Sequence, residues 1–549
     1  MTVLFVARHF TYFRNFESVV RQLAARGHRV HVAAEKDEAL GGRAMVDRLA
    51  AESPLVTVGY VPPRADEQWF AISTVLRRSL DYLRYDAPMY DAAPMIRQRA
   101  WDRTPRLALS LARLPGRRAV EAALDALDRA VPTDAAIDAF VREHAPDVVL
   151  LTPLIELGSP QLDVLKSARA QAIPTALAVW SWDHLTSKAR IRLAPDRVLV
   201  WNETQKHEAI DLHGVAADRI VVTGAQCFDK WFDRQPSRSR EQFCRDMGLP
   251  ADRPFVLYVC SALFRGGPPE AEFVRQWVEA LRSASAPPAV RNAAILVRPH
   301  PQRMYEWDNV TLPEGVVCHG GHPIDQQGRD DYFDALYYAA SIVGINTSAM
   351  IEGAIVDRPV LTIQPPEFSG SQGGTLHFRY LLDGRSGFLH SARTLEEHVS
   401  QLADALDGRP QRTNTAFVRH FIRPLGTDRA ASPAFVDALE QLAALRPVAS
   451  RHERRSLSSL LWRPMLNAWH ANTDRASVAA LMLEAGHAAE EQERARKLED
   501  KQARVRAREA ERRAQAAAKR DRYVAKRRQQ RVAHLKTFVR RMLPPGSHS

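Results

Sequence analysis

Cysteine is scarce in this chain, and its spacing argues against sites built from cysteine. Among 549 residues only four cysteines occur, and no two of them form a C-x-x-C pair: Cys227, Cys244, Cys260 and Cys318. Neither a disulfide framework nor a structural zinc site is indicated by this pattern. We expect the four side chains to be small buried hydrophobes in a reducing compartment.

Long apolar runs are also missing. No segment approaches the roughly 20 apolar residues that a membrane-spanning helix needs. The apolar start, Met1–Ala7, is too short for the core of a signal peptide, and its only nearby charge follows it. We therefore expect a soluble cytoplasmic protein, held at most peripherally at the inner face of the membrane.

Positive charge is abundant, but it is confined to one end of the chain. The whole sequence has 76 Lys+Arg and 64 Asp+Glu, a net charge of +12. Residues 451–549 contain 24 basic and 11 acidic residues, so their net charge is +13. Residues 1–450 keep 76 − 24 = 52 basic and 64 − 11 = 53 acidic residues, a net of −1. The excess charge therefore indicates a basic tail on a neutral body and not a nucleic-acid-binding protein.

Short runs of Val, Ile and Leu alternate with helical patterns in the neutral body. The runs of the first half are Val3–Val6, Arg29–Ala33, Leu55–Val58, Asp147–Leu151, Pro174–Val179, Arg197–Val200 and Arg219–Val222. After the polar stretch Arg234–Arg240 come Phe255–Val259, Ala293–Val297, Ser341–Val343 and Val360–Ile363. Continuous apolar runs between helices predict parallel sheets covered on both faces. We predict an α/β protein with two doubly wound, Rossmann-like domains, 1–224 and 225–446.

Two further segments interrupt or follow this pattern. Residues 67–141 form a helical insertion rich in Arg and aromatic residues, which is either a subdomain packed on the sheet or a lid over an acceptor. Residues 447–549 form a basic tail in which His487–Leu543 has no Gly or Pro and predicts one long helix. The heptad spacing of apolar residues in this helix is not sustained, so a coiled coil is one alternative for it.

Polar residues follow two predicted strands of the second domain. Arg298-Pro299-His300-Pro301 follows one strand, and Thr347-Ser348 opens a helix that contains Glu352 after another. Helix N-termini and cations at the carboxyl ends of parallel strands bind phosphates. Thr347 and Ser348 serve equally well as plain helix caps. Glu352 could accept a hydrogen bond from a ribose hydroxyl. Ser261 is a weaker candidate for the donor site, in a turn whose two glycines could let the backbone approach a phosphate.

These motifs resemble those of glycosyltransferases with the GT-B fold. The nearest groups are CDP-glycerol glycerophosphotransferases and capsule-type polysialyltransferases, to which Arg298–Pro301 and Gly344–Ala354 are similar. Val222–Asp229 and Phe421–Ser432 are similar to the domain junction and the closing helix of that superfamily. The resemblance implies that Arg298, His300, Thr347 and Ser348 contact a nucleotide-activated donor. One departure is the first turn, Ala7–Phe13, which lacks a glycine-rich loop.

The chemistry that this resemblance implies needs no metal and no separate cofactor, since the nucleotide-activated donor is itself a substrate. No Asp-x-Asp motif occurs, so the metal ligands of the other large glycosyltransferase fold are missing. A helix N-terminus and a cation can stabilise the departing phosphate. The acceptor hydroxyl needs a base from the first domain, and the candidates are His9, Glu156, Asp183 and His184. The segment that holds Asp183 and His184 is alternatively a packed interdomain loop.

Three functions remain open at this level. The leading hypothesis is transfer of a sugar or a polyol phosphate to a cell-envelope or capsular acceptor, a glycan or a lipid-linked molecule. UDP-N-acetylglucosamine 2-epimerases share much of the C-terminal part of this motif pattern, so an isomerase is the nearest alternative function. The third is a binding module in which the basic tail contacts an anionic membrane or a coiled-coil partner. RNA is not expected, because Tyr523 and Phe538 are almost the only aromatic residues of the tail helix.

Overall fold

The computed structural model describes residues 1–37, 41–263, 267–308, 310–321, 323, 325–382, 387–408, 414–445, 457–478 and 480. The chain divides into two compact units, Met1–Met482 and Leu483–Ser549. Every described residue belongs to the first unit. The helix predicted for His487–Leu543, with its coiled-coil alternative, lies outside the described residues.

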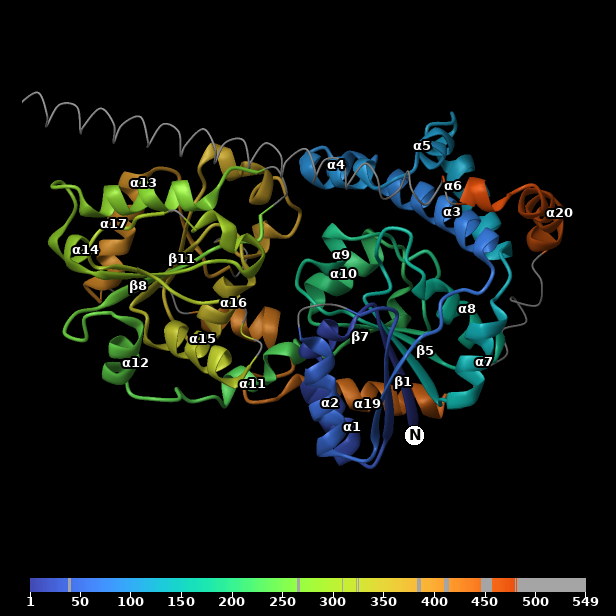
Figure 1. Cartoon of the computed structure of the whole chain (residues 1–549), viewed down its shortest axis with the longest axis horizontal. Coiled ribbons are helices and arrows are strands. Elements are labelled where there is room, and N and C mark those ends of the chain that lie inside the picture. The colour runs from blue at the N-terminus through green and yellow to red at the C-terminus, as the bar shows by residue number, and fades with distance from the viewer. Residues whose placement is uncertain are drawn as a thin grey trace, which may run out of the picture. The chain divides into compact units, whose positions relative to one another are not determined.

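Seven parallel strands form the first sheet, in the order β3-β2-β1-β4-β5-β6-β7 (Figure 1). The strands are β1 Thr2–Ala7, β2 Arg29–Ala34, β3 Val56–Tyr60, β4 Val148–Thr152, β5 Thr175–Ala178, β6 Arg197–Val200 and β7 Ile220–Val222. Val3 of β1 pairs with Val30 on one side and with Val148 on the other. The direction of winding therefore reverses between β1 and β4.

Helices cover both faces of this sheet, as the continuous apolar runs predict. Alternate residues of β1 point to opposite faces: Leu4 and Val6 join one hydrophobic cluster, while Val3 and Phe5 join the other. The first face carries α7 Ala135–His144, α8 Gln161–Ala170 and α10 Glu203–Asp211, and the second α1 Glu17–Ala25 and α2 Gly42–Glu52. We call the residues packed on this sheet the N-lobe.

Six parallel strands form the second sheet, in the order β10-β9-β8-β11-β12-β13. They are β8 Phe255–Val259, β9 Ala294–Arg298, β10 Val316–Cys318, β11 Ser341–Gly344, β12 Val360–Ile363 and β13 His390–Ala392. Its helices are α12 Arg240–Met247, α13 Glu270–Arg282, α14 Pro288–Asn292, α15 Gln326–Tyr338, α16 Ser348–Ile355 and α17 Leu395–Leu406. We call this part the C-lobe. The predicted α/β class with two doubly wound parallel sheets is confirmed.

The insertion begins at Glu67 and consists of helices packed on one another and on the N-lobe. They are α3 Glu67–Tyr85, α4 Pro94–Asp102, α5 Arg106–Ala112 and α6 Arg117–Ala130. Arg77 of α3 is 1% exposed and pairs with Asp128 of α6 at 3.1 Å and with Asp163 of α8 at 2.5 Å. A buried charge that loses its partner is strongly destabilising. These ion pairs therefore attach the insertion to the N-lobe as a packed subdomain.

Helix α19, Ala431–Ala444, packs on the N-lobe although the sequence division places it in the second domain. Phe435 and Leu439 are fully buried among residues of β1, β2 and α1. The carboxylate of Asp229 caps the start of this helix, accepting from the backbone N–H groups of Ala431 and Ser432 at 2.8 Å each. The apolar stripe of α19 suits either sheet, so only tertiary packing decides which one it covers.

The segment after the C-lobe returns to the insertion. Helix α20, Leu457–Ala471, packs on α6 and α3, and its Leu466 is fully buried there. The ring of His470 stacks on Trp69 at 4.6 Å, and its Nε2 lies 3.0 Å from a carboxylate oxygen of Asp66. Part of the predicted tail 447–549 therefore belongs to the insertion. Among the described residues no helix is long and apolar enough to cross a membrane.

Candidate active site

Both sheets carry polar residues where their strands end. In doubly wound sheets the ligand site lies outside the carboxyl ends of the strands, where the strand order reverses. In the N-lobe this point lies between β1 and β4, and in the C-lobe between β8 and β11. The residues that follow these four strands and their neighbours form the candidate site.

In the C-lobe, Ser261 joins the two loops at the reversal point. Its hydroxyl oxygen, which is fully buried, accepts a hydrogen bond from the backbone N–H of Asn346 at 3.0 Å. Its own backbone N–H donates to Glu270 at 2.7 Å. Burial raises the pKa of Glu270 to about 8. Ser261 therefore shapes the loops of the site through buried contacts.

Thr347 and Ser348 stand at the N-terminus of α16, as the sequence predicts. Thr347 is the cap residue, and its hydroxyl accepts from the backbone N–H of Ala349 at 3.5 Å. Ser348 is exposed and Thr347 partly exposed. Capping and anion binding use the same end of the helix, since unpaired N–H groups point outward there. The positions of Thr347 and Ser348 are therefore compatible both with helix capping and with anion binding.

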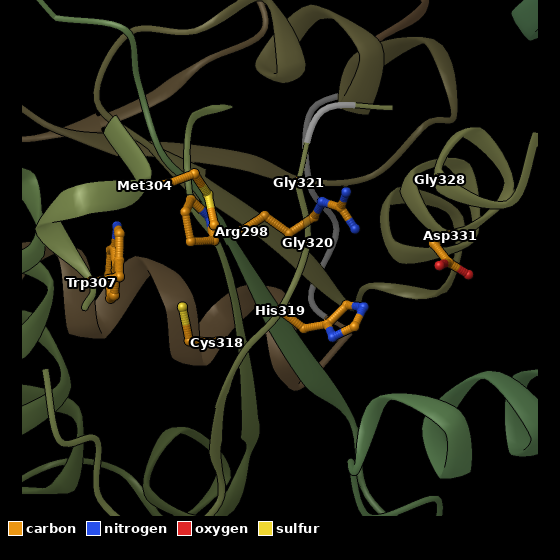
Figure 2. Close-up of a pocket in the computed structure, with 10 residues that line it drawn as sticks. Arg298, Met304, Trp307, Cys318, His319, Gly320, Gly321, Gly328 and Asp331 are labelled. Atoms are coloured by element: carbon orange, nitrogen blue, oxygen red, sulfur yellow. The ribbon is translucent and has the colours of Figure 1, made fainter. Parts of the chain in front are cut away.

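Arg298 borders a cavity of about 410 Å³ at the ends of β9 and β10 (Figure 2). The cavity is lined by Arg298, Pro299, Met304, Trp307, Cys318, His319, Gly320, Gly321, Gly328 and Asp331. Figure 2 shows the guanidinium extending toward the helix that carries Asp331, with Trp307 and Cys318 on the other side. Cys318, expected to be buried, is exposed in this wall.

The guanidinium of Arg298 is held in a defined place. It stacks on the ring of Tyr332 at 5.1 Å, and only 6% of the residue is exposed. A Cβ on Gly320 would lie 2.7 Å from its central carbon, so a larger residue there would displace the arginine. Nη1 has no hydrogen-bond partner in the described part of the chain, and burial lowers the pKa of the group. An unpartnered buried guanidinium nitrogen is suited to an anionic ligand.

His300 and Glu352, the other predicted donor-binding residues, have partners of their own. Nδ1 of His300 accepts from the backbone N–H of Gln302 at 3.2 Å and caps the short helix Pro301–Glu306. Glu352 accepts from the hydroxyl of Tyr332, the ring on which Arg298 stacks. Burial raises the pKa of Glu352 to about 7. Glu352 thus reaches the arginine through Tyr332, while His300 lies on the turn after β9.

In the N-lobe, the structure brings His9 and Glu156 together through Tyr12. The Tyr12 hydroxyl donates to Glu156 Oε1 at 2.8 Å, and its ring lies 4.5 Å from that of His9. Arg8 forms an ion pair with Glu156. Trp180 packs edge-on against Tyr12 at 5.1 Å. Residues that follow β1, β4 and β5 therefore form one acid–phenol–imidazole cluster at the strand ends.

Glu35 belongs to the same strand ends and was not singled out from the sequence. It follows β2, and burial raises its pKa to about 8, while the charge of Arg8 acts in the opposite direction. Its Oε1 has no hydrogen-bond partner among the described residues. A carboxylate directly after a buried strand is the signal that sequence reasoning could have used. A protonated carboxyl group at pH 7 can donate a proton or a hydrogen bond.

Asp183 and His184, the remaining base candidates, are engaged elsewhere. Asp183 accepts hydrogen bonds from Ser181 and Ser187 and lies 4.0 Å from the ammonium of Lys188, contacts that hold its pKa low despite burial. His184 is fully buried. Its Nε2 lies 3.0 Å from the Pro153 carbonyl, and burial lowers its pKa to about 3. Asp183 therefore pairs with Lys188, while His184 connects this segment to Pro153 at the end of β4.

His377 is a C-lobe residue that contacts this N-lobe segment. Its Nδ1 lies 3.2 Å from the hydroxyl of Thr186, and its ring packs edge-on against Trp182 at 4.5 Å. Burial lowers the pKa of His377 to about 4, so the imidazole is neutral at pH 7. Nothing in the spacing around Gly373–His377 distinguishes this histidine, which is why sequence reasoning missed it.

A second and larger cavity, of about 690 Å³, lies next to this contact. Its walls come from the insertion between α3 and α4, from α10, from Thr186 and from the segment 376–421. The lining residues are Met89, Ala92, Thr186, Thr204, His207, Glu208, Asp211, Leu212, Leu376, Arg379, Tyr380, Phe417, His420 and Phe421. Glu208 is 4% exposed, and burial raises its pKa to about 8, while its contact with Tyr380 acts in the opposite direction. Aromatic rings beside a neutral carboxyl group can recognise sugar rings and their hydroxyl groups.

The described residues contain no group of three or more His, Cys, Asp or Glu side chains placed to hold a metal ion.

No protein-family model matches the chain, and no curated protein matches it either. Among solved structures the chain is similar to a glycosyltransferase from Rickettsia africae ESF-5, at 12% identity over 81% of this chain and 99% of that one, with a TM-score of 0.47. It is also similar to the UDP-GlcNAc 2-epimerase of Methanocaldococcus jannaschii, at 11% identity over 80% and 100% of the two chains, TM-score 0.47. A third similar structure is the Neisseria meningitidis UDP-GlcNAc 2-epimerase bound to UDP-GlcNAc, at 11% identity over 80% and 100%, TM-score 0.46.

Proposed function

We propose that the protein is a metal-independent transferase of the GT-B type. It moves a sugar or a polyol phosphate from a nucleotide-activated donor to a glycan or lipid-linked acceptor of the cell envelope or capsule. The observation that carries this proposal is the pair of sites in one compact unit. The C-lobe offers a buried cation beside a cavity, and the N-lobe offers a cluster of proton-accepting groups. A CDP-glycerol type of glycerophosphotransferase is the finer form of the same proposal.

The donor is assigned to the C-lobe cavity and to the start of α16, although Thr347 and Ser348 do not line that cavity. Arg298 has a buried nitrogen without a partner, which suits a phosphate oxygen. The exposed end of α16 at Thr347 and Ser348 adds backbone N–H groups, and charge accumulating on the departing phosphate is stabilised by both. Trp307 borders the cavity and offers an aromatic surface on which a flat nucleobase can stack. His300 supports the turn that positions Arg298.

Glu156 is the proposed base, because it lies at the strand reversal and touches both a phenol and a cation. Tyr12 and His9 extend the hydrogen-bonding surface toward an incoming hydroxyl. Glu35 and Arg8 set the local charge at the ends of β1 and β2. Asp183 and His184 are proposed to support this surface by fixing Lys188 and the end of β5.

The acceptor is assigned to the second cavity. Tyr380 offers a ring for stacking, and Glu208 offers a carboxyl group that stays protonated near pH 7. This cavity is also what favours transfer over isomerisation, since an epimerase acts on the nucleotide sugar alone. An NMR assay with nucleotide sugars and no acceptor separates the two. Turnover of UDP-N-acetylglucosamine without an acceptor would support the isomerase and refute the transferase.

The first experiment is a thermal-shift panel of UDP-, CDP- and GDP-activated donors on the full chain. At least one donor should raise the midpoint, and Arg298→Gln should abolish that increase. Arg291→Gln is the matched control, because Arg291 is a partly exposed arginine on α14 that bonds only a backbone carbonyl. If no donor stabilises the wild type, the donor assignment is wrong.

The basic tail is proposed to hold the enzyme near its acceptor, through an anionic membrane surface at the inner face or a coiled-coil partner. Its net charge of +13 over residues 451–549 motivates this role. Truncation should follow Met482, the end of the first unit, because α20 packs on the insertion. Weaker vesicle binding with intact donor binding is the expected result. Unchanged binding to anionic vesicles would contradict the membrane role.

A further inference from the structure

Helix α5 and the turn into α6 form an exposed surface that combines arginines with leucines. We call this surface the α5 tip and define it by Arg106, Leu107, Arg113, Leu114 and Arg118, which are all exposed. Leu107 is 41% and Leu114 52% exposed. Single exposed leucines are ordinary on soluble proteins. Two of them interleaved with three arginines on one short segment are the feature to be explained.

The charge of this segment departs from that of the surrounding body. Residues 103–120 contain five arginines and no acidic residue, whereas residues 1–450 as a whole have a net charge of −1. Arg106 and Arg118 make no side-chain hydrogen bond or ion pair within the described residues, and Arg113 stacks on Trp101 at 4.3 Å. The two carboxylates that flank this segment have other partners, since Asp102 accepts from Gln98 and Glu121 pairs with Arg190.

The same combination recurs on α20, which packs on α6. Met465 is 46% exposed, and Arg463 beside it is exposed as well. In Figure 1, α5, α6 and α20 gather at one end of the insertion. The buried ion pairs of Arg77 hold this end to the N-lobe, so the surface is presented by a fixed structure. A rigid surface pays little entropy when it docks.

We propose that the α5 tip docks on the surface of an anionic phospholipid bilayer. Arginines attract acidic headgroups, and the interleaved leucines enter the boundary between headgroups and acyl chains. This occupant fits both properties of the surface, whereas a nucleic acid would use only the charge. The inference does not depend on the proposed reaction, because it concerns a face of the insertion that contains none of the proposed donor or base residues.

Co-sedimentation of the full chain with vesicles tests this inference. The vesicles contain phosphatidylcholine alone or phosphatidylcholine with phosphatidylglycerol. We expect binding only to the second kind, weakening as salt is raised. Arg106→Gln with Arg118→Gln should weaken it about 25-fold, at about fivefold for each arginine. Leu114→Asn should weaken it about tenfold, with little dependence on salt.

Matched controls distinguish vesicle binding by the α5 tip from binding through overall charge or through the tail. Arg48→Gln with Arg142→Gln removes the same charge from two exposed N-lobe arginines and should leave binding unchanged. Leu425→Asn is the apolar control, since Leu425 is 43% exposed in the C-lobe. The tail is identical in every variant. Wild-type binding by the Arg106/Arg118 variant, or an equal loss in the arginine control, would overturn the proposal. So would concentration-dependent self-association at the α5 tip without vesicle binding.

Discussion

Replacing Glu156 by Gln isolates the proposed proton-accepting step. Glu156 accepts from the Tyr12 hydroxyl at 2.8 Å through Oε1 and pairs with Arg8 through Oε2. A glutamine has the same shape and keeps an oxygen for Tyr12. It loses the negative charge beside Arg8 and no longer accepts a proton. The substitution therefore changes the chemistry of the group and leaves its packing intact.

The substitution should affect the stability of the fold much less than the rate of the reaction. The ion pair is partly exposed, with 38% of the Arg8 side chain and 17% of the Glu156 side chain accessible, so its loss should cost at most about 1 kcal/mol of stability. Loss of a general base typically slows a reaction about 10²- to 10⁴-fold, which is about 3–5 kcal/mol in the barrier. Activity should therefore collapse while the protein stays folded.

Steady-state kinetics with the donor varied measure this outcome. We expect kcat to fall by at least about 100-fold while KM for the donor changes less than about twofold, because donor and base lie on different lobes. Glu143→Gln is the control, an exposed glutamate of α7 that should behave as wild type. Full activity of Glu156→Gln would refute the assignment of the base.

Three further substitutions test the donor site, the buried ion pairs of Arg77 and the carboxyl group of the second cavity. Arg298→Gln should weaken donor binding about 10- to 100-fold, measured by calorimetry, because it removes a charge-assisted hydrogen bond. Asp163→Asn should lower the unfolding free energy by about 3–5 kcal/mol in denaturant titrations, because it leaves Arg77 buried with one carboxylate partner fewer. Glu208 has a folded pKa of about 8 against an ordinary 4.5, so the folded state keeps a proton that the unfolded chain releases between these values. Between about pH 4.5 and about pH 8 the stability of the wild type should therefore fall more steeply than that of Glu208→Gln, which still contains the raised carboxyl groups of Glu35, Glu270 and Glu352. Equal pH slopes for wild type and variant would contradict that reasoning.

Much of the fold could be read from the sequence because buried parallel strands are continuous apolar runs. β8, Phe255–Val259, is buried at every position, and its run predicted it directly. β10 and β13 were missed, since each has only three residues and is partly exposed. The packing of helix α19 on the N-lobe was not predicted, for a different reason. Its contacts with the N-lobe join residues separated by some 400 positions, such as Arg26 and Glu440, and no local pattern reports them.

The positions of candidate residues were predictable where they directly follow a strand. Arg298 and Thr347 lie at strand ends that the sequence already indicated. Glu35 and His377 were not predicted as candidates, because their burial and their partners come from distant segments. Conversely, His184 has the residue type of a base, but its ring is buried against the Pro153 carbonyl. Residue type indicates what a side chain can do, and its partners decide whether it is available.

The donor assignment requires that the C-lobe cavity beside Arg298 binds a nucleotide. Calorimetric titration of UDP, CDP and GDP into the full chain tests it most directly, with Arg298→Gln and Arg291→Gln measured alongside. At least one nucleotide should bind to the wild type and to the Arg291 control, and its affinity should fall about 10- to 100-fold in the Arg298 variant. Absence of binding by all three nucleotides, or equal affinity in the two variants, would contradict it.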